Sequence, residues 1–220
     1  MTIAQTRPFG QRYAFVVVGV IFCALLISSA MRAAPGVLLL PLQNAFGWGR
    51  DTVSLSAALG ILIYGLAGPF AAALMERIGL RRTVIGALVL MSGSTAASLW
   101  MTQPWHLMLT WGLVSGIGTG SIAAVLGATI ANRWFTTNRG LVMGLMSAST
   151  ATGTLIFLPA MAALAESGGW KTVVTAIALA AAAVIPFIYF LVPERPSAID
   201  RKSTRLNSSH KTVSRMPSSA

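Results

Sequence analysis

Six long apolar segments constrain the fold of this chain more than any other feature. A helix that crosses a bilayer needs about 20 mainly apolar residues, because the hydrocarbon core is about 30 Å thick. The segments cover residues 13–40, 53–74, 83–101, 107–131, 140–164 and 173–192. They are too long for strands, lack period-two alternation, and as strands would leave sheet edges in lipid. The sequence therefore predicts an all-α membrane protein with six transmembrane helices.

Composition agrees with this prediction. Only 10% of the residues are charged, against about 25% in soluble domains, and the mean hydropathy is +0.73. The first apolar segment is longer than the core of a cleavable signal peptide, about 7–15 residues, so we expect it to remain in the membrane. We divide the chain into an N-terminal segment (1–12), a six-helix bundle (13–196) and a disordered tail (197–220).

Basic residues predict the orientation of the helices, because Lys and Arg concentrate in cytoplasmic loops. On one side of the predicted bundle lie Arg7, Arg12, Arg77, Arg81, Arg82, Arg133, Arg139 and Arg195, whereas the other side has Arg50 and Lys171. We therefore expect a multi-pass protein of the cell membrane, meaning the inner or plasma membrane, with a cytoplasmic N-terminus.

Other classes of function find little support. The net charge of +11 does not indicate nucleic-acid binding, because the basic residues lie between apolar blocks rather than on one face. An enzyme needs clustered acid–base or metal-binding groups, but His106 stands alone in a predicted outer loop and His210 lies in the tail. No metal site, cofactor or ATP-binding loop is indicated, so we expect the protein not to be an enzyme.

Small residues indicate how the helices pack. Gly112, Gly116 and Gly120 are four apart on one face of the fourth segment, and Gly140 and Gly144 repeat this spacing in the fifth. Such stripes allow close approach of helices in lipid, and packing alone explains them.

Aromatic and basic residues follow both the first and the fourth helix. The first is followed by Phe46, Trp48 and Arg50, and the fourth by Trp134, Phe135 and Arg139. The two groups would lie on opposite sides of the membrane. This pattern suggests a 3+3 inverted repeat.

The loop between the second and third segments carries the strongest motif, A-A-L-M-E-R-I-G-L-R-R, at residues 72–82. It resembles the major facilitator superfamily signature G-x-L-x-D-R-x-G-x-R-R: Arg77, Gly79, Arg81 and Arg82 match, Glu76 replaces Asp, and Ala72 replaces Gly. The resemblance implies half of a twelve-helix transporter, with this loop as a conformational switch. Glu76 is expected to pair with Arg81, Arg133 or Arg139. Alternatively, the loop serves only to set topology.

Further stretches resemble the monocarboxylate and oxalate–formate branch of that superfamily. They are M-R-A-A-P-G-V-L-L-L-P-L with F-G-W-G-R at residues 31–50, R-W-F-T-T-N-R-G-L-V-M-G-L at 133–145, and Pro159 followed by G-G-W-K at 168–171. The resemblance covers about residues 10–196. The resemblance to this branch implies that helices one and four line a substrate site.

Arg32 is the ionisable residue within an otherwise apolar span. A central arginine costs at least ~2.5 kcal/mol on insertion scales and normally faces a cavity, and its planar fork suits a carboxylate. We predict that Arg32 binds substrate, with Tyr64 and Thr119 as neighbours. The alternative is an arginine that extends to the outer interface.

The tail has a separate explanation. Residues 200–220 match the translation of a common sequencing-library adapter, so we expect them to be artefactual and the natural chain to continue into a second, missing six-helix half. The leading hypothesis for the function of the whole protein is secondary transport of a small organic anion, such as a monocarboxylate or dicarboxylate, by symport or exchange across the lipid bilayer. The alternatives are a transporter of another solute class and a structural or receptor-like membrane protein.

Overall fold

The computed structural model describes residues 8–122 and 139–191 of the chain, and the described part is a bundle of long helices. In chain order they are α1 (Pro8–Phe46), α2 (Arg50–Ile78), α3 (Leu80–Ala97), the 3₁₀ turn η1 (Ser98–Trp100), α4 (Pro104–Leu107), the π-helix η2 (Met108–Val114), a helical continuation at 115–122, and α6 (Arg139–Leu191). No strand occurs in these ranges. The predicted all-α membrane fold is confirmed.

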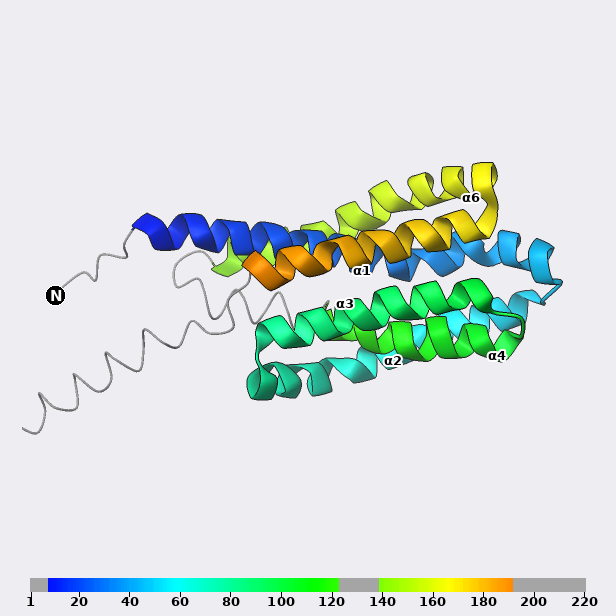
Figure 1. Ribbon diagram of the computed structural model, residues 1–220, viewed down its shortest axis with the longest axis horizontal. Helices are drawn as coiled ribbons and strands as arrows, with labels where there is room; N and C mark the ends of the chain where they lie inside the picture. The colour runs from blue at the N-terminus through cyan, green and yellow to red at the C-terminus, as the bar shows by residue number, and fades with distance from the viewer. Residues whose placement is uncertain (1–7, 123–138, 192–220) are drawn as a thin grey trace, which may run out of the picture.

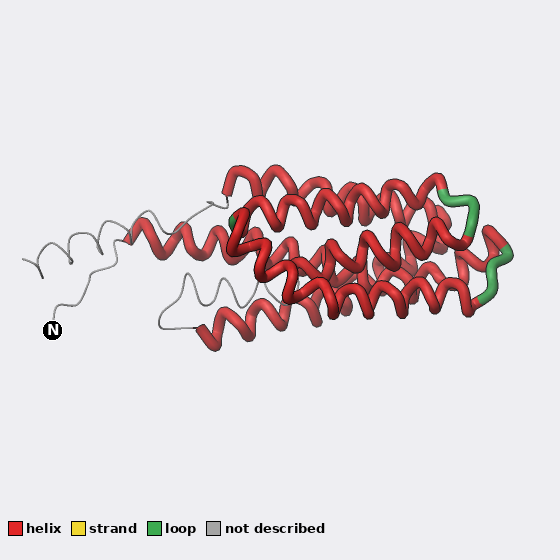
Figure 2. The backbone as a smooth tube through the Cα atoms, turned by 90° about the horizontal axis from the view of Figure 1, so that it is seen from below, coloured by secondary structure: helices red, strands yellow, loops and turns green. Residues whose placement is uncertain are grey.

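The bundle is built from antiparallel passes along one long axis (Figures 1 and 2). α6 contains two of these passes, because Gly169 has non-helical backbone angles and reverses the chain. The turns that follow α1 and η1 lie at the same end of the bundle as the reversal within α6, and the turn between α2 and α3 lies at the opposite end, with the start of α1 and the end of α6 (Figure 1). Phe46 and Trp170 join two of these turns, with ring centroids 5.3 Å apart.

Helix boundaries differ from the predicted ones by several residues, most clearly in the first and fourth segments. α1 begins at Pro8 and ends at Phe46, outside the predicted 13–40 at both ends, because the polar residues at its ends continue the helix. The fourth predicted segment is divided among α4, the π-helix η2 and the helix at 115–122. In the described residues, four helices are long and apolar enough to span a membrane, and the last, Met143–Leu191, contains the Gly169 reversal.

Apolar side chains cover both the inside and the outside of the bundle. Ile21, Leu25 and Leu88 are at most 1% exposed in its core. In contrast, Leu155 and Phe190 on α6 are 77% and 78% exposed. A water-soluble protein rarely presents so much apolar surface, so the outer faces are suited to lipid.

Hydroxyl groups connect the helices across the core. Ser29 on α1 donates to the Thr150 carbonyl on α6 at 2.6 Å and lies 2.7 Å from the Thr154 hydroxyl. Ser92 on α3 donates to the Ala178 carbonyl at 3.1 Å. In lipid such bonds supply part of the attraction between helices that the hydrophobic effect supplies in water.

Candidate functional site

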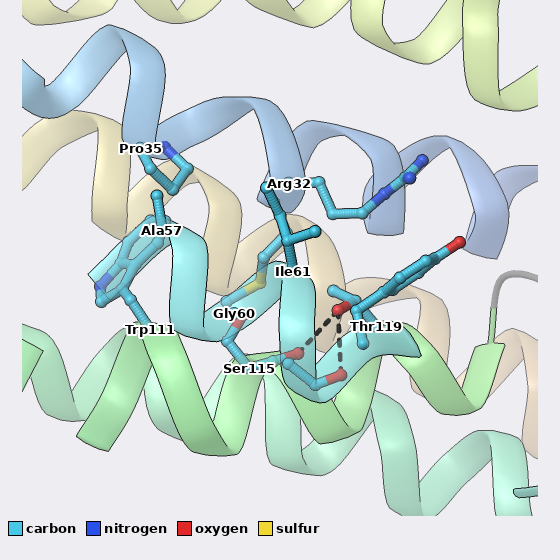
Figure 3. Close-up of a pocket in the computed structure, with 11 residues that line it drawn as sticks. Arg32, Pro35, Ala57, Gly60, Ile61, Trp111, Ser115 and Thr119 are labelled. Carbon is cyan, nitrogen blue, oxygen red and sulfur yellow. Dashed lines mark hydrogen bonds between the residues drawn. The ribbon is translucent and has the colours of Figure 1, made fainter. Parts of the chain in front are cut away.

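A cavity of about 330 Å³ lies between α1, α2 and the fourth transmembrane pass, which consists of α4, η2 and the helix at 115–122. Its lining residues recur at helical spacing on each element (Figure 3). They are Met31, Arg32 and Pro35 on α1, Ala57, Gly60, Ile61 and Tyr64 on α2, and Trp111, Ser115, Gly116 and Thr119 on the fourth pass. The three residues predicted to bind substrate, Arg32, Tyr64 and Thr119, therefore line one cavity.

Arg32 lies near the middle of the candidate span Val16–Phe46. At 1.5 Å per residue it is about 24 Å along the helix from Val16 and about 21 Å from Phe46. Its guanidinium carbon lies 5.1 Å from the centroid of the Tyr64 ring, a distance typical of a cation–π contact. This contact holds the charge at the cavity.

Thr119, a predicted neighbour of Arg32, lines the same cavity. Its side chain is 2% exposed, and its hydroxyl donates to the Ser115 carbonyl at 2.8 Å and is 3.3 Å from the Gly116 carbonyl (Figure 3). Because the hydroxyl donates its proton to a backbone carbonyl, it can interact with another group only as a hydrogen-bond acceptor.

The glycine stripe of the fourth pass lies against α2. A Cβ added at Gly112 would be 2.9 Å from Leu59 Cδ2, one at Gly116 would be 3.0 Å from the Gly60 carbonyl oxygen, and one at Gly120 would be 2.6 Å from the Tyr64 carbonyl oxygen. The close approach of the two backbones thus determines how far apart α2 and the fourth pass lie beside the cavity. By contrast, an added Cβ at Gly140 or Gly144 meets nothing within 4 Å in the described part of the chain.

The motif loop forms the turn between α2 and α3. Gly79 has a φ of 98°, as expected of a glycine turn, and its carbonyl accepts from the Thr83 hydroxyl at 2.9 Å. The guanidinium of Arg81 lies 4.4 Å from the centroid of the Tyr189 ring on α6. The loop is thus braced against the last helix.

The other motif residues lie around this turn. Ala72 is half-buried on α2, and Glu76, Arg77 and Arg82 are exposed. Arg77 also lines a groove of about 520 Å³. Of the proposed partners of Glu76, Arg133 lies outside the described residues, and so does the side chain of Arg139. The Glu76 ion pair stays a prediction, as does the nature of residues 197–220, which are also outside the described ranges.

The sequence analysis did not single out Trp111 or Ser115. Both precede Thr119 at intervals of four residues, so the helical spacing of the fourth segment could have placed them on the same face. Trp111 is 6% exposed, and its indole N–H is buried without a hydrogen-bond partner in the described residues. Within those residues, no three His, Cys, Asp or Glu side chains come close enough to hold a metal ion.

Comparison with known proteins identifies the family. The model of the Major Facilitator Superfamily matches residues 11–217. The chain belongs to the major facilitator superfamily. It is therefore a multi-pass membrane protein of a transporter family, as the motif at residues 72–82 predicted.

Individual relatives agree with the predicted branch. The chain is 28% identical over 165 residues to monocarboxylate transporter 9 of Mus musculus, covering 75% of this chain and 32% of that protein. It is 24% identical over 161 residues to the uncharacterized MFS-type transporter YcxA of Bacillus subtilis (strain 168), covering 73% of this chain and 40% of that protein. The chain thus spans well under half the length of these curated relatives.

A solved structure shares the fold. The proton:xylose symporter XylE, bound to 6-bromo-6-deoxy-D-glucose, superposes with a TM-score of 0.74 at 18% identity. The superposition covers 85% of this chain and 46% of that one. The chain therefore has the architecture of roughly half a major facilitator fold.

Proposed function

We propose that the chain is the N-terminal half of a secondary transporter that moves a small organic anion, either a monocarboxylate or a dicarboxylate, by alternating access. Arg32 on the cavity wall is the observation that carries this proposal. Binding of a carboxylate would pair its two oxygens with the planar guanidinium. Tyr64 would keep the guanidinium oriented through the cation–π contact at 5.1 Å.

The surroundings of Arg32 favour a strong interaction with an anion. Pro35, Ala57 and Ile61 line the same cavity with apolar groups, and a second half of the transporter that covered them would exclude water and so strengthen a charge pair with Arg32. Thr119 would complete the site with an oxygen that accepts a hydrogen bond, for example from a hydroxyl group of the substrate. Residue 32 would then discriminate anions from neutral solutes.

The second half of the transporter would close the cavity from the opposite side. In the family's mechanism, two halves rock about a central site and expose it alternately to the two sides of the membrane. The motif loop, from Ala72 to Arg82, would act as the conformational switch at the cytoplasmic surface, with the N-terminus on the same side. The protein would reside in the cell membrane and act as a transporter, not an enzyme.

The coupling mechanism would be symport or exchange. The acids of the described residues are Asp51, Glu76 and Glu166, and all three are exposed near helix ends. None of them lines the cavity with Arg32. Proton symport would therefore need an acid from the other half, whereas anion exchange would need none.

Uptake measurements on the full-length transporter test this proposal. Arg32→Ala should nearly abolish carboxylate uptake, and Arg32→Lys should weaken it, because lysine keeps the charge but loses the planar fork. Arg50→Ala is the matched control, since Arg50 lies at the start of α2 and outside the cavity. Normal uptake by Arg32→Ala, with membrane insertion intact, would instead identify Arg32 as an interfacial anchor. Uptake of a neutral solute that does not depend on Arg32 would favour a transporter of another class.

A further inference from the structure

Trp111 separates two cavities in the described structure. It lines the central cavity of about 330 Å³, which also contains Arg32. It also lines a second space of about 10 Å³, which it shares with Leu38, Leu42 and Leu107. Pro35 is the other residue that lines both. Trp111 and Pro35 thus lie between the central cavity and the smaller space beyond it.

Trp111 lies opposite the charged end of the cavity. Figure 3 shows Trp111 beside Pro35 and Ala57 at one end, while the guanidinium of Arg32 extends toward the other end. An anion bound at Arg32 would therefore point the remainder of its structure along Ile61 and Ala57 toward the indole. These walls are apolar, so they suit an alkyl chain.

The backbone that carries Trp111 is held firmly against α2. Ser56 donates to the Leu107 carbonyl at 3.1 Å. A Cβ added at Gly60 would be 3.3 Å from the Trp111 carbonyl oxygen, and one at Gly112 would be 3.2 Å from the Ser56 carbonyl oxygen. Since neither backbone can move closer and Trp111 is 6% exposed, this residue is tightly packed at the end of the cavity.

We propose that Trp111 is the end wall of the substrate cavity and sets the maximum chain length of the carboxylate that the transporter accepts. This inference rests on the proposed function, because it takes the Arg32 end as the site of the carboxylate. Within that function it assigns the substrate class: acids with an unbranched apolar tail, which bind more tightly with each added methylene until the tail reaches the indole. Each methylene that fits should strengthen binding about fourfold.

Competition experiments on the full-length transporter test the length limit. Straight-chain acids from acetate to decanoate would compete with a labelled short-chain acid, and the limit is the acid beyond which affinity falls. Trp111→Ala should join the two cavities and move the limit to longer acids. Ala57→Leu should fill part of the cavity and move it to shorter acids. Leu113→Ala is the matched control, because Leu113 is in the same π-helix but is 37% exposed and lines neither cavity.

The outcomes separate this inference from the proposed function. An unchanged limit in a folded Trp111→Ala protein overturns it, and so does a Leu113→Ala variant that shifts the limit equally. If Trp111→Ala fails to reach the membrane, Ala57→Leu decides, and an unchanged limit there overturns the inference. If the transporter takes up carboxylates of every length tested, the inference about the end wall is refuted but the proposed function is not. A transporter that binds no carboxylate refutes the proposed function, and this inference with it.

Discussion

Replacing Gly120 by alanine should weaken the packing between α2 and the fourth transmembrane pass. The added methyl group would lie 2.6 Å from the Tyr64 carbonyl oxygen and 2.8 Å from Ala67 Cβ. Both neighbours belong to or are attached directly to the backbone of α2, so neither can rotate away. The two helices must therefore separate, and Tyr64, whose ring lies 5.1 Å from the guanidinium carbon of Arg32, moves with α2.

The expected magnitude is the difference between two opposing effects. Overpacking a core typically costs about 1–3 kcal/mol, whereas alanine favours a helix over glycine by about 0.8–1.0 kcal/mol. Gly93→Ala supplies the second effect alone, because a Cβ at Gly93 on α3 meets nothing within 4 Å in the described residues. Gly120→Ala should therefore be about 1–3 kcal/mol less stable than Gly93→Ala.

Denaturant unfolding of the full-length protein in detergent micelles, followed by tryptophan fluorescence, measures this difference. Carboxylate uptake by the Gly120→Ala variant should also fall, because the Tyr64–Arg32 contact is displaced. Equal free energies of unfolding for Gly120→Ala and Gly93→Ala would refute the argument that the glycine stripe is required for close approach to α2.

Three further predictions concern the motif loop and the orientation. Gly79→Ala should lower the free energy of unfolding by about 1–2 kcal/mol, measured in the same assay, because φ is 98° there and a Cβ strains that conformation. A double-mutant cycle with Arg81→Gln and Tyr189→Leu should give a coupling free energy of about 0.5–1 kcal/mol, and additivity would exclude a cation–π contribution. Glu76→Cys and Glu166→Cys, in a background without the native cysteine, should react with an impermeant thiol reagent from opposite sides of the membrane; labelling from one side would contradict the orientation.

Much of the fold could be predicted because the membrane reduces the choices. Apolar length identifies spanning helices with little help from tertiary contacts, and the Gly79 turn was recognised from its motif. The ends of α1 could not be predicted, because polar residues such as Gln43 and Asn44 are compatible with both a helix and a loop. Residues 108–114 also carry no pattern that distinguishes a π-helix from an α-helix, so this geometry could not be predicted.

Part of the candidate site could also be predicted because the protein lies in a membrane. A charge in an apolar span is conspicuous, so Arg32 could be identified from the sequence alone. Trp111 was not singled out, because a tryptophan in a membrane helix is compatible with a lipid-facing or a cavity-facing position, although its spacing from Thr119 places the two on the same face. Ser56 and Gly60 set the packing around it, but their partners are far away in the sequence and become visible only in three dimensions.

The π-helix η2 has a consequence for how this cavity can change during evolution. A π turn holds one more residue than an α turn, so deleting one residue between Met108 and Val114 would restore regular α geometry. The parts of the pass on either side would keep the faces they present, because the π turn accommodates the extra residue locally. The loss of a single codon would thus alter the backbone beside Trp111 while Arg32 and the opposite end of the cavity stayed unchanged.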